Sequence, residues 1–142
     1  MADTQEPLAP NPAGSNPAGW NPVGWFEIYV ADMGWARAFY ADVTGVSLTL
    51  SPMSGGDMEM WFFDAASGAE GAAGALIRHP MRSPNMDGTL VYFSVDDCAA
   101  AITRAAAHDV PVLVDKQSIG DMGFIAIIGD SEGNSIGLHS FK

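Results

Sequence analysis

The chain has 142 residues, of which 48% are hydrophobic, and its 17 acidic and 6 basic side chains give a formal net charge of -11. A chain of this length buries roughly two-thirds of its unfolded surface, so we expect one domain with a hydrophobic core. The acidic charge argues against nucleic acid as a partner because it repels phosphate backbones. It either favours a cationic ligand or serves solubility.

We expect a cytoplasmic protein that neither spans nor enters a membrane. No apolar run is long enough to cross a bilayer, and the N-terminus lacks the basic and apolar regions of a signal peptide. Cys98 is the single cysteine, which excludes an internal disulfide and suits a reducing compartment.

Residues 1–21 are predicted to form a flexible, proline-rich arm. The sequence Asn-Pro-Ala-Gly occurs twice in it, and its prolines cannot donate the hydrogen bonds of a helix or sheet. Two alternatives stay open for Trp20: it docks on the fold or on a partner subunit, or the arm is a mobile leader.

The segment Trp25–Asp32 predicts a strand that leads directly into a helix. Phe26, Ile28 and Val30 are apolar at every second position, which is the period of a strand with two different faces. The aspartate at the end of the segment has the short carboxylate of an N-cap, and apolar residues follow it at helical spacing. We therefore expect a helix over residues 33–44.

Three further strands are expected before the middle of the chain. Residues 47–53 and 58–64 are strand-like and flank a turn at 54–57 with two glycines, which indicates a hairpin. Residues 75–78 give a short third strand. The segment 81–88 contains Pro84 and is predicted to be an irregular linker.

The second half of the sequence repeats this plan. An offset of 65 residues places Leu90–Asp97 on Trp25–Asp32, and a second helix is expected near residues 97–108. The strands predicted to follow are 112–118, 124–129 and 135–141.

These elements predict an α+β fold of two tandem βαβββ modules. Module one spans 22–80, the linker 81–88 and module two 89–142, within one domain. Four strands cannot close a barrel, so we expect a curved mixed sheet around a cleft, with the helices outside.

The chain resembles the vicinal oxygen chelate superfamily, which groups glyoxalase I, bleomycin-resistance proteins and extradiol dioxygenases. The resemblance covers about residues 23 to 141. It rests on residues 26–30 with Asp32, 38–40 before Gly45, 91–95 with Asp97, and 130–134 before 136–138. It implies the fold strongly and the chemistry weakly, because this scaffold carries several activities.

The resemblance implies that metal-dependent members of that superfamily bind the metal through a ring of His, Glu or Gln side chains from both modules. The resemblance places Trp25, Leu90 and Gly137 at three of those positions, and none offers a donor atom on its side chain. We therefore predict no metal or other cofactor in this ring. A divalent metal recruited through His79 or Glu59 stays open as the alternative.

Strand alternation predicts which side chains line the cleft. Glu27 and His139 are the tentative catalytic pair, because a carboxylate next to an imidazole can transfer protons. A structural hydrogen bond between the modules would explain the same pair equally well. The predicted ligand-binding residues are Trp25, Tyr29, Trp61, Leu90, Tyr92 and Gly137.

Two functions from different classes remain. The first is a small-molecule-binding protein of the glyoxalase/bleomycin-resistance type, which sequesters an organic and cationic ligand without altering it. The second is a glyoxalase-related lyase or isomerase, or a dioxygenase, that uses Glu27 and His139. In both cases we expect a homodimer, because edge strands otherwise stay open.

Overall fold

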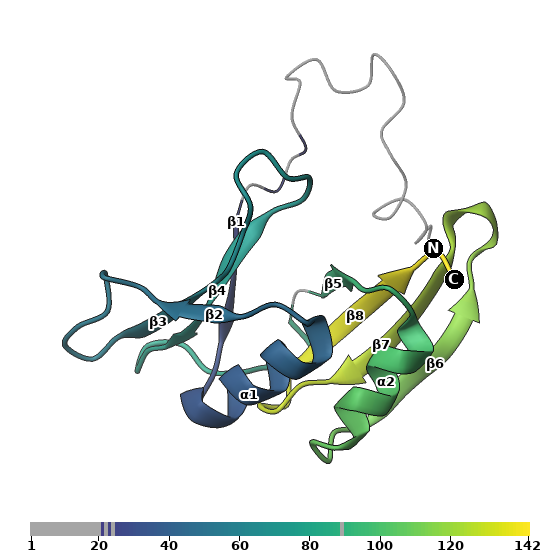
Figure 1. Ribbon diagram of the computed structural model, residues 1–142. Helices are drawn as coiled ribbons and strands as arrows, with labels where there is room; N and C mark the ends of the chain where they lie inside the picture. The colour runs from purple at the N-terminus through teal and green to yellow at the C-terminus, as the bar shows by residue number, and fades with distance from the viewer. Residues whose placement is uncertain (1–20, 22, 24, 89) are drawn as a thin grey trace.

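Two four-stranded sheets with two helices beside them make up the protein (Figure 1). The computed structural model describes residues 21, 23, 25–88 and 90–142. The elements are β1 (Trp25–Tyr29), α1 (Met33–Thr44), β2 (Leu48–Leu50), β3 (Glu59–Phe63), β4 (Ala73–Arg78), β5 (Val91–Ser94), α2 (Cys98–Ala106), β6 (Val112–Ser118), the 3-10 helix η2 (Gly120–Met122), β7 (Phe124–Gly129) and β8 (Ser135–Ser140). The arm expected over residues 1–21 lies outside the described residues except for its last, exposed residue.

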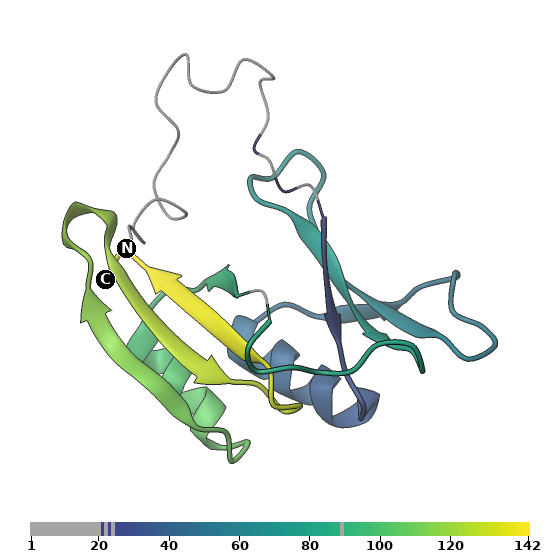
Figure 2. The ribbon, with the colours of Figure 1, turned by 180° about the vertical axis from the view of Figure 1, so that it is seen from behind.

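Both sheets have the same topology. The first has the order β1-β4-β3-β2 and the second β5-β8-β7-β6, and in each the first strand pairs in parallel with the last strand of its module. The other pairs are antiparallel. Seen from behind, α2 lies on the far face of the second sheet, and α1 lies between the two sheets (Figure 2). The predicted pair of βαβββ modules is therefore confirmed.

Helix α1 has the predicted bounds, whereas α2 is shorter than predicted at both ends. Asp32 and Asp97 are N-caps whose carboxylates accept from backbone N–H groups of the first turn, and Gly45 ends α1 in the left-handed conformation. The second helix ends at Ala106, because the chain turns through Asp109, which has a positive φ of 58°. None of the described helices is long and apolar enough to cross a membrane.

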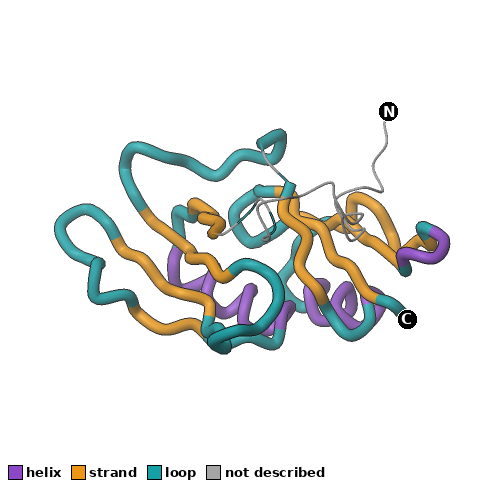
Figure 3. The backbone as a smooth tube through the Cα atoms, turned by 90° about the horizontal axis from the view of Figure 1, so that it is seen from above, coloured by secondary structure: helices purple, strands orange, loops and turns teal. Residues whose placement is uncertain are grey.

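The two helices lie next to each other (Figure 3). Polar contacts join their C-terminal ends. Arg104 of α2 donates to the backbone carbonyls of Asp42 and Val43, at 3.0 and 3.1 Å. His108 lies just beyond α2, and its Nε2 is 2.8 Å from a carboxylate oxygen of Asp42. The two Arg104 bonds satisfy carbonyls that the end of α1 leaves without partners.

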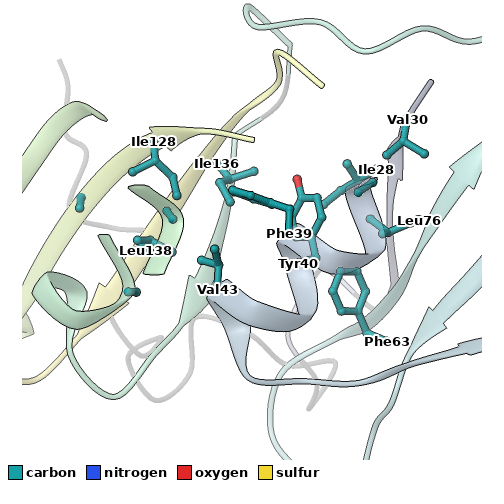
Figure 4. Close-up of a cluster of buried hydrophobic side chains, with 14 of the residues drawn as sticks. Ile28, Val30, Phe39, Tyr40, Val43, Phe63, Leu76, Ile128, Ile136 and Leu138 are labelled. Atoms are coloured by element: carbon teal, nitrogen blue, oxygen red, sulfur yellow. The ribbon is translucent and has the colours of Figure 1, made fainter. Parts of the chain in front are cut away.

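One core holds the two modules together (Figure 4). Phe39 and Tyr40 of α1 are fully buried between strands of both sheets. Their neighbours in this core include Ile28, Phe63 and Leu76 from the first sheet and Ile128, Ile136 and Leu138 from the second. Because a single cluster draws on both halves, neither module has a core of its own on this side.

A buried carboxylate lies at the joint between the modules. Asp130, which is 3% exposed, accepts a 2.6 Å hydrogen bond from the Tyr40 hydroxyl of module one. It also accepts from the backbone N–H groups of Glu132 and Asn134 and from the Asn134 side-chain amide, each at 2.8 Å. The same turn reaches β1, because the Asn134 amide donates to the Tyr29 carbonyl at 3.2 Å.

We predict that Tyr40→Phe destabilises the protein by about 1–3 kcal/mol, because it removes one hydrogen bond to a buried charge. Urea unfolding followed by circular dichroism measures this change. Thr44→Val is the control on the same helix, because it also removes a hydrogen-bonded hydroxyl, which donates to the Tyr40 carbonyl and accepts from the Val46 N–H but contacts no buried carboxylate. An equal loss in both variants would contradict a special role for the Asp130 bond.

The same substitution changes how stability depends on pH. Burial, followed by the charge of Asp130, raises the pKa of Tyr40 well above its usual value. The folded state thus keeps a proton that the unfolded chain releases above about pH 10, so the free energy of unfolding falls as the pH rises beyond that value. Tyr40→Phe should flatten this decline. Part of it remains, since the pKa values of Tyr29 and Tyr92 are also raised.

Candidate functional site

Strand β1 presents two different faces. Ile28 and Phe26 belong to the core against the helices. Trp25, Glu27 and Tyr29 alternate with them and lie on the opposite face of the sheet. We call the faces of both sheets that point away from the helices the helix-free face, and the residues of interest on it are Trp25, Glu27, Tyr29, Phe62, Tyr92, Gly137 and His139.

Glu27 lies at the centre of a hydrogen-bonded row along β1. Its carboxylate accepts from the Tyr29 hydroxyl at 2.7 Å and from the Trp25 indole N–H at 3.3 Å. Burial and then the hydrogen bond to Glu27 raise the pKa of Tyr29, which keeps the phenol protonated and donating. The Arg82 guanidinium stands 5.4 Å from the Tyr29 ring centroid. The row therefore combines the Glu27 carboxylate with two aromatic rings, and one guanidinium lies beside the Tyr29 ring.

Small side chains on β4 lie beneath the aromatic residues of the neighbouring strands, and Ala75 among them is fully buried. Ala73 pairs with Trp25 and Ala75 pairs with Glu27 in the parallel register. Trp25 reaches across them and meets Phe62 of β3 edge to face, with 5.5 Å between the ring centroids. Trp25 itself is 44% exposed. An apolar ligand can therefore contact this pair of rings without displacing the core.

Trp61, predicted to bind ligand, lies on the other face of the first sheet. It pairs with Leu76, which is in the core, and the Arg37 guanidinium packs on its ring. The aromatic residue of β3 that belongs to the helix-free face is Phe62, which the sequence analysis did not single out. The alternation of β3 was ambiguous because Met60, Trp61 and Phe62 are all large and apolar.

In the second sheet, the ring of Tyr92 occupies the space above Gly137. The two residues are paired partners on β5 and β8, and a Cβ atom added at Gly137 would overlap the ring carbons of Tyr92. Burial raises the pKa of Tyr92. The glycine is thus required by the packing of the tyrosine, and a glutamate at this position would force the ring to move.

His139 is held within its own module. It is 8% exposed, and its Nε2 lies 2.6 Å from the backbone carbonyl oxygen of Met122 in η2, so this nitrogen carries the proton and donates. The Phe141 ring packs edge-on at 4.7 Å between ring centroids. Among the hydrogen bonds of the described residues, none joins His139 to Glu27. The contacts of His139 and Glu27 do not support proton transfer between the two residues, which stays a prediction.

The residues at the three metal positions do not fit a metal ion. Trp25 directs its indole N–H to Glu27, Leu90 lies just before β5 with 37% exposure, and Gly137 is covered by Tyr92. Across the described part of the chain, no three His, Cys, Asp or Glu side chains gather as a metal site. The alternative ligands are engaged elsewhere: Glu59 accepts from Trp61, and His79 Nδ1 accepts from the Met81 N–H.

A cavity of about 330 Å³ lies on the helix side of the first sheet, away from Glu27 and Tyr92. Phe26, Phe63 and Phe93 line it together with the loop between β3 and β4. Its aromatic lining belongs to the packing between the modules, because these three rings contact one another at 5.5–5.7 Å between centroids.

The family model that matches this chain and the solved structures similar to it indicate the same fold. Residues 23–138 match the model of the Glyoxalase/Bleomycin resistance protein/Dioxygenase superfamily. A search of curated proteins found no match.

Several solved structures share the fold. TnmS3, an antibiotic binding protein from Streptomyces sp. CB03234, is 25% identical with a TM-score of 0.59, and the match covers 87% of this chain and 98% of that one. A family enzyme from Burkholderia phytofirmans PsJN is 15% identical with a TM-score of 0.64, covering 84% and 98%. The trypanothione-dependent glyoxalase I of Leishmania major is 19% identical with a TM-score of 0.60, covering 82% and 84%.

We predict that Gly137→Ala lowers the free energy of unfolding by about 1–3 kcal/mol, because the added methyl group overpacks against Tyr92. In a Tyr92→Ala background the same substitution should cost much less, since the obstructing ring is gone. Urea unfolding of the four proteins completes a double-mutant cycle. Additive losses would contradict the contact between the two residues.

Proposed function

We propose that this chain, which belongs to the Glyoxalase/Bleomycin resistance protein/Dioxygenase superfamily, binds a small organic molecule on its helix-free face and releases it unchanged. The observation that carries the proposal is what Trp25 and Gly137 contact. An indole hydrogen-bonded to Glu27 and a tyrosine ring packed on Gly137 stand at positions where the resemblance predicts metal ligands. Such a surface recognises a ligand by stacking and charge.

The chemistry of β1 favours a ligand that joins an aromatic ring to a cationic group. Trp25 and Phe62 offer ring edges and faces for stacking, while the Glu27 carboxylate, fixed by two donors, supplies the negative charge. The net charge of -11 acts in the same direction, because it raises the local concentration of cations. TnmS3, whose fold is similar, is an antibiotic binding protein, and this supports binding as the function.

The proposal includes a homodimer, in which a second copy completes the site. Trp25 and Leu90 are large apolar residues with 44% and 37% exposure, and Met81 in the linker is 81% exposed. The four edge strands β1, β2, β5 and β6 are open on one side in the single chain. Covering these groups with a second copy would bury apolar area and enclose the ligand. We also propose a cytoplasmic location, which suits the buried free thiol of Cys98.

We predict that Glu27→Gln weakens binding of benzylic amines by about 10-fold, which corresponds to the loss of one charge-assisted contact. Isothermal titration calorimetry with benzylamine derivatives measures this, and the matching benzyl alcohols test the role of charge. The matched control is Glu70→Gln, because it removes the same charge from an exposed residue of the β3–β4 loop.

Two results would overturn the proposal. The first is equal affinity for amines and alcohols in the parent protein together with no effect of Glu27→Gln. The second is copurification of zinc, nickel, iron or manganese near one equivalent that is lost in Glu27→Gln, which would establish a metalloenzyme instead.

We predict that the protein sediments as a dimer at micromolar concentration, because the apolar residues of the helix-free face need cover. Leu90→Glu should shift it toward the monomer by placing an unpaired charge in the interface. Analytical ultracentrifugation measures both species. The control is Trp35→Glu, which adds the same charge at an exposed apolar residue of helix α1, away from the edge strands. A monomeric parent protein would contradict the assembly and leave ligand binding to be judged by calorimetry.

A further inference from the structure

Arg37 on α1 is held flat against an aromatic ring on the helix side of the first sheet. Its guanidinium carbon is 3.5 Å from the ring centroid of Trp61. The ring is itself fixed, since its indole N–H donates to Glu59 at 2.9 Å and Glu59 also contacts Arg78 at 3.4 Å. Stacking on an aromatic face orients the planar guanidinium and leaves its edge free for hydrogen bonds.

The Arg37 guanidinium has no acceptor within the described residues. Its Nε is buried and makes no hydrogen bond, and it pairs with no carboxylate there. In contrast, Arg78 and Lys116 pair with carboxylates and Arg104 donates to two carbonyls. A buried donor without a partner destabilises the protein, so an acceptor supplied by a ligand would be favourable.

Arg37 also lines an open surface depression of about 340 Å³, which we call the Arg37 cavity. Gly34, Ala38 and Ala41 of α1 form one wall, and Ser47 and Leu48 form the other. The small residues on the helix keep the space open, and no acidic residue lines it. Its volume falls at the lower end of the range of small-molecule sites, which is about 300–1,000 Å³.

We propose that this cavity binds a small organic carboxylate, with the carboxylate on the edge of the Arg37 guanidinium and an apolar tail along Ala38, Ala41 and Leu48. A planar fork of N–H donors matches a carboxylate in two parallel hydrogen bonds. The site lies on the opposite face of the first sheet from Glu27 and takes the opposite charge. It is therefore independent of the function proposed above.

The experiment compares 4-phenylbutyrate with its neutral amide by calorimetry and by the NMR signal of the Trp61 indole. We expect the acid to bind and to shift that signal, and the amide to bind at least about 10-fold more weakly. Arg37→Gln should remove the preference for the acid. Arg37→Lys should keep only part of it, because a point charge cannot form the paired hydrogen bonds.

Arg82→Gln is the matched control, since Arg82 also stands over an aromatic ring, that of Tyr29, but does not line this cavity. It should leave acid binding unchanged. Ala38→Phe at an exposed helix position should fill the cavity and abolish binding while the melting temperature holds. The proposal fails if acid and amide bind equally, if Arg82→Gln has the same effect as Arg37→Gln, or if Ala38→Phe leaves acid binding intact.

Discussion

The arrangement of the two modules depends on one buried carboxylate, that of Asp130, which pairs with no cation among the described residues. Burying a charge costs several kcal/mol unless hydrogen bonds replace its hydration, and Asp130 meets this demand with four donors. Three of the donors belong to its own turn, so the turn is rigid before the modules meet. The fourth is Tyr40 of module one, and it can be reached only when α1 packs against the second sheet. The carboxylate therefore stabilises one relative placement of the two modules.

That placement also sets the position of the candidate site. The side chain of Glu132, in the same turn, accepts from the backbone N–H groups of Ala31 and Asp32, where β1 passes into α1. Asn134 adds its bond to the Tyr29 carbonyl. The end of β1 is thus tied to module two through its backbone atoms. These contacts do not depend on which side chains the strand carries. The row from Trp25 to Tyr29 can consequently carry residues chosen for binding, while the strand itself stays fixed.

The sequence was sufficient for the fold and only partly sufficient for the site, and the difference has a physical cause. Strands β1 and β5 alternate clearly, so Glu27 and Tyr92 were assigned to the correct face. In β3 every residue from Met60 to Phe63 is large and apolar, so the sequence does not show which residues share a face. The register with β4 places Phe62, and not Trp61, on the helix-free face. The partner of His139 is a backbone carbonyl in η2. Such an acceptor has no signature in the sequence, because every residue carries one.

Neighbouring aromatic residues of β3 belong to the two different sites proposed above, because their side chains lie on opposite faces of the sheet. Phe62 contacts Trp25 in the row that contains Glu27, whereas Trp61 supports Arg37 on the helix side. A strand buried on both sides must be apolar on both, and large aromatic residues meet that requirement while also offering ring faces to ligands. The sheet between them separates a carboxylate from a guanidinium that would otherwise neutralise each other as an ion pair. In the two proposals, each of these charges therefore faces a ligand of the opposite sign on its own side of the sheet.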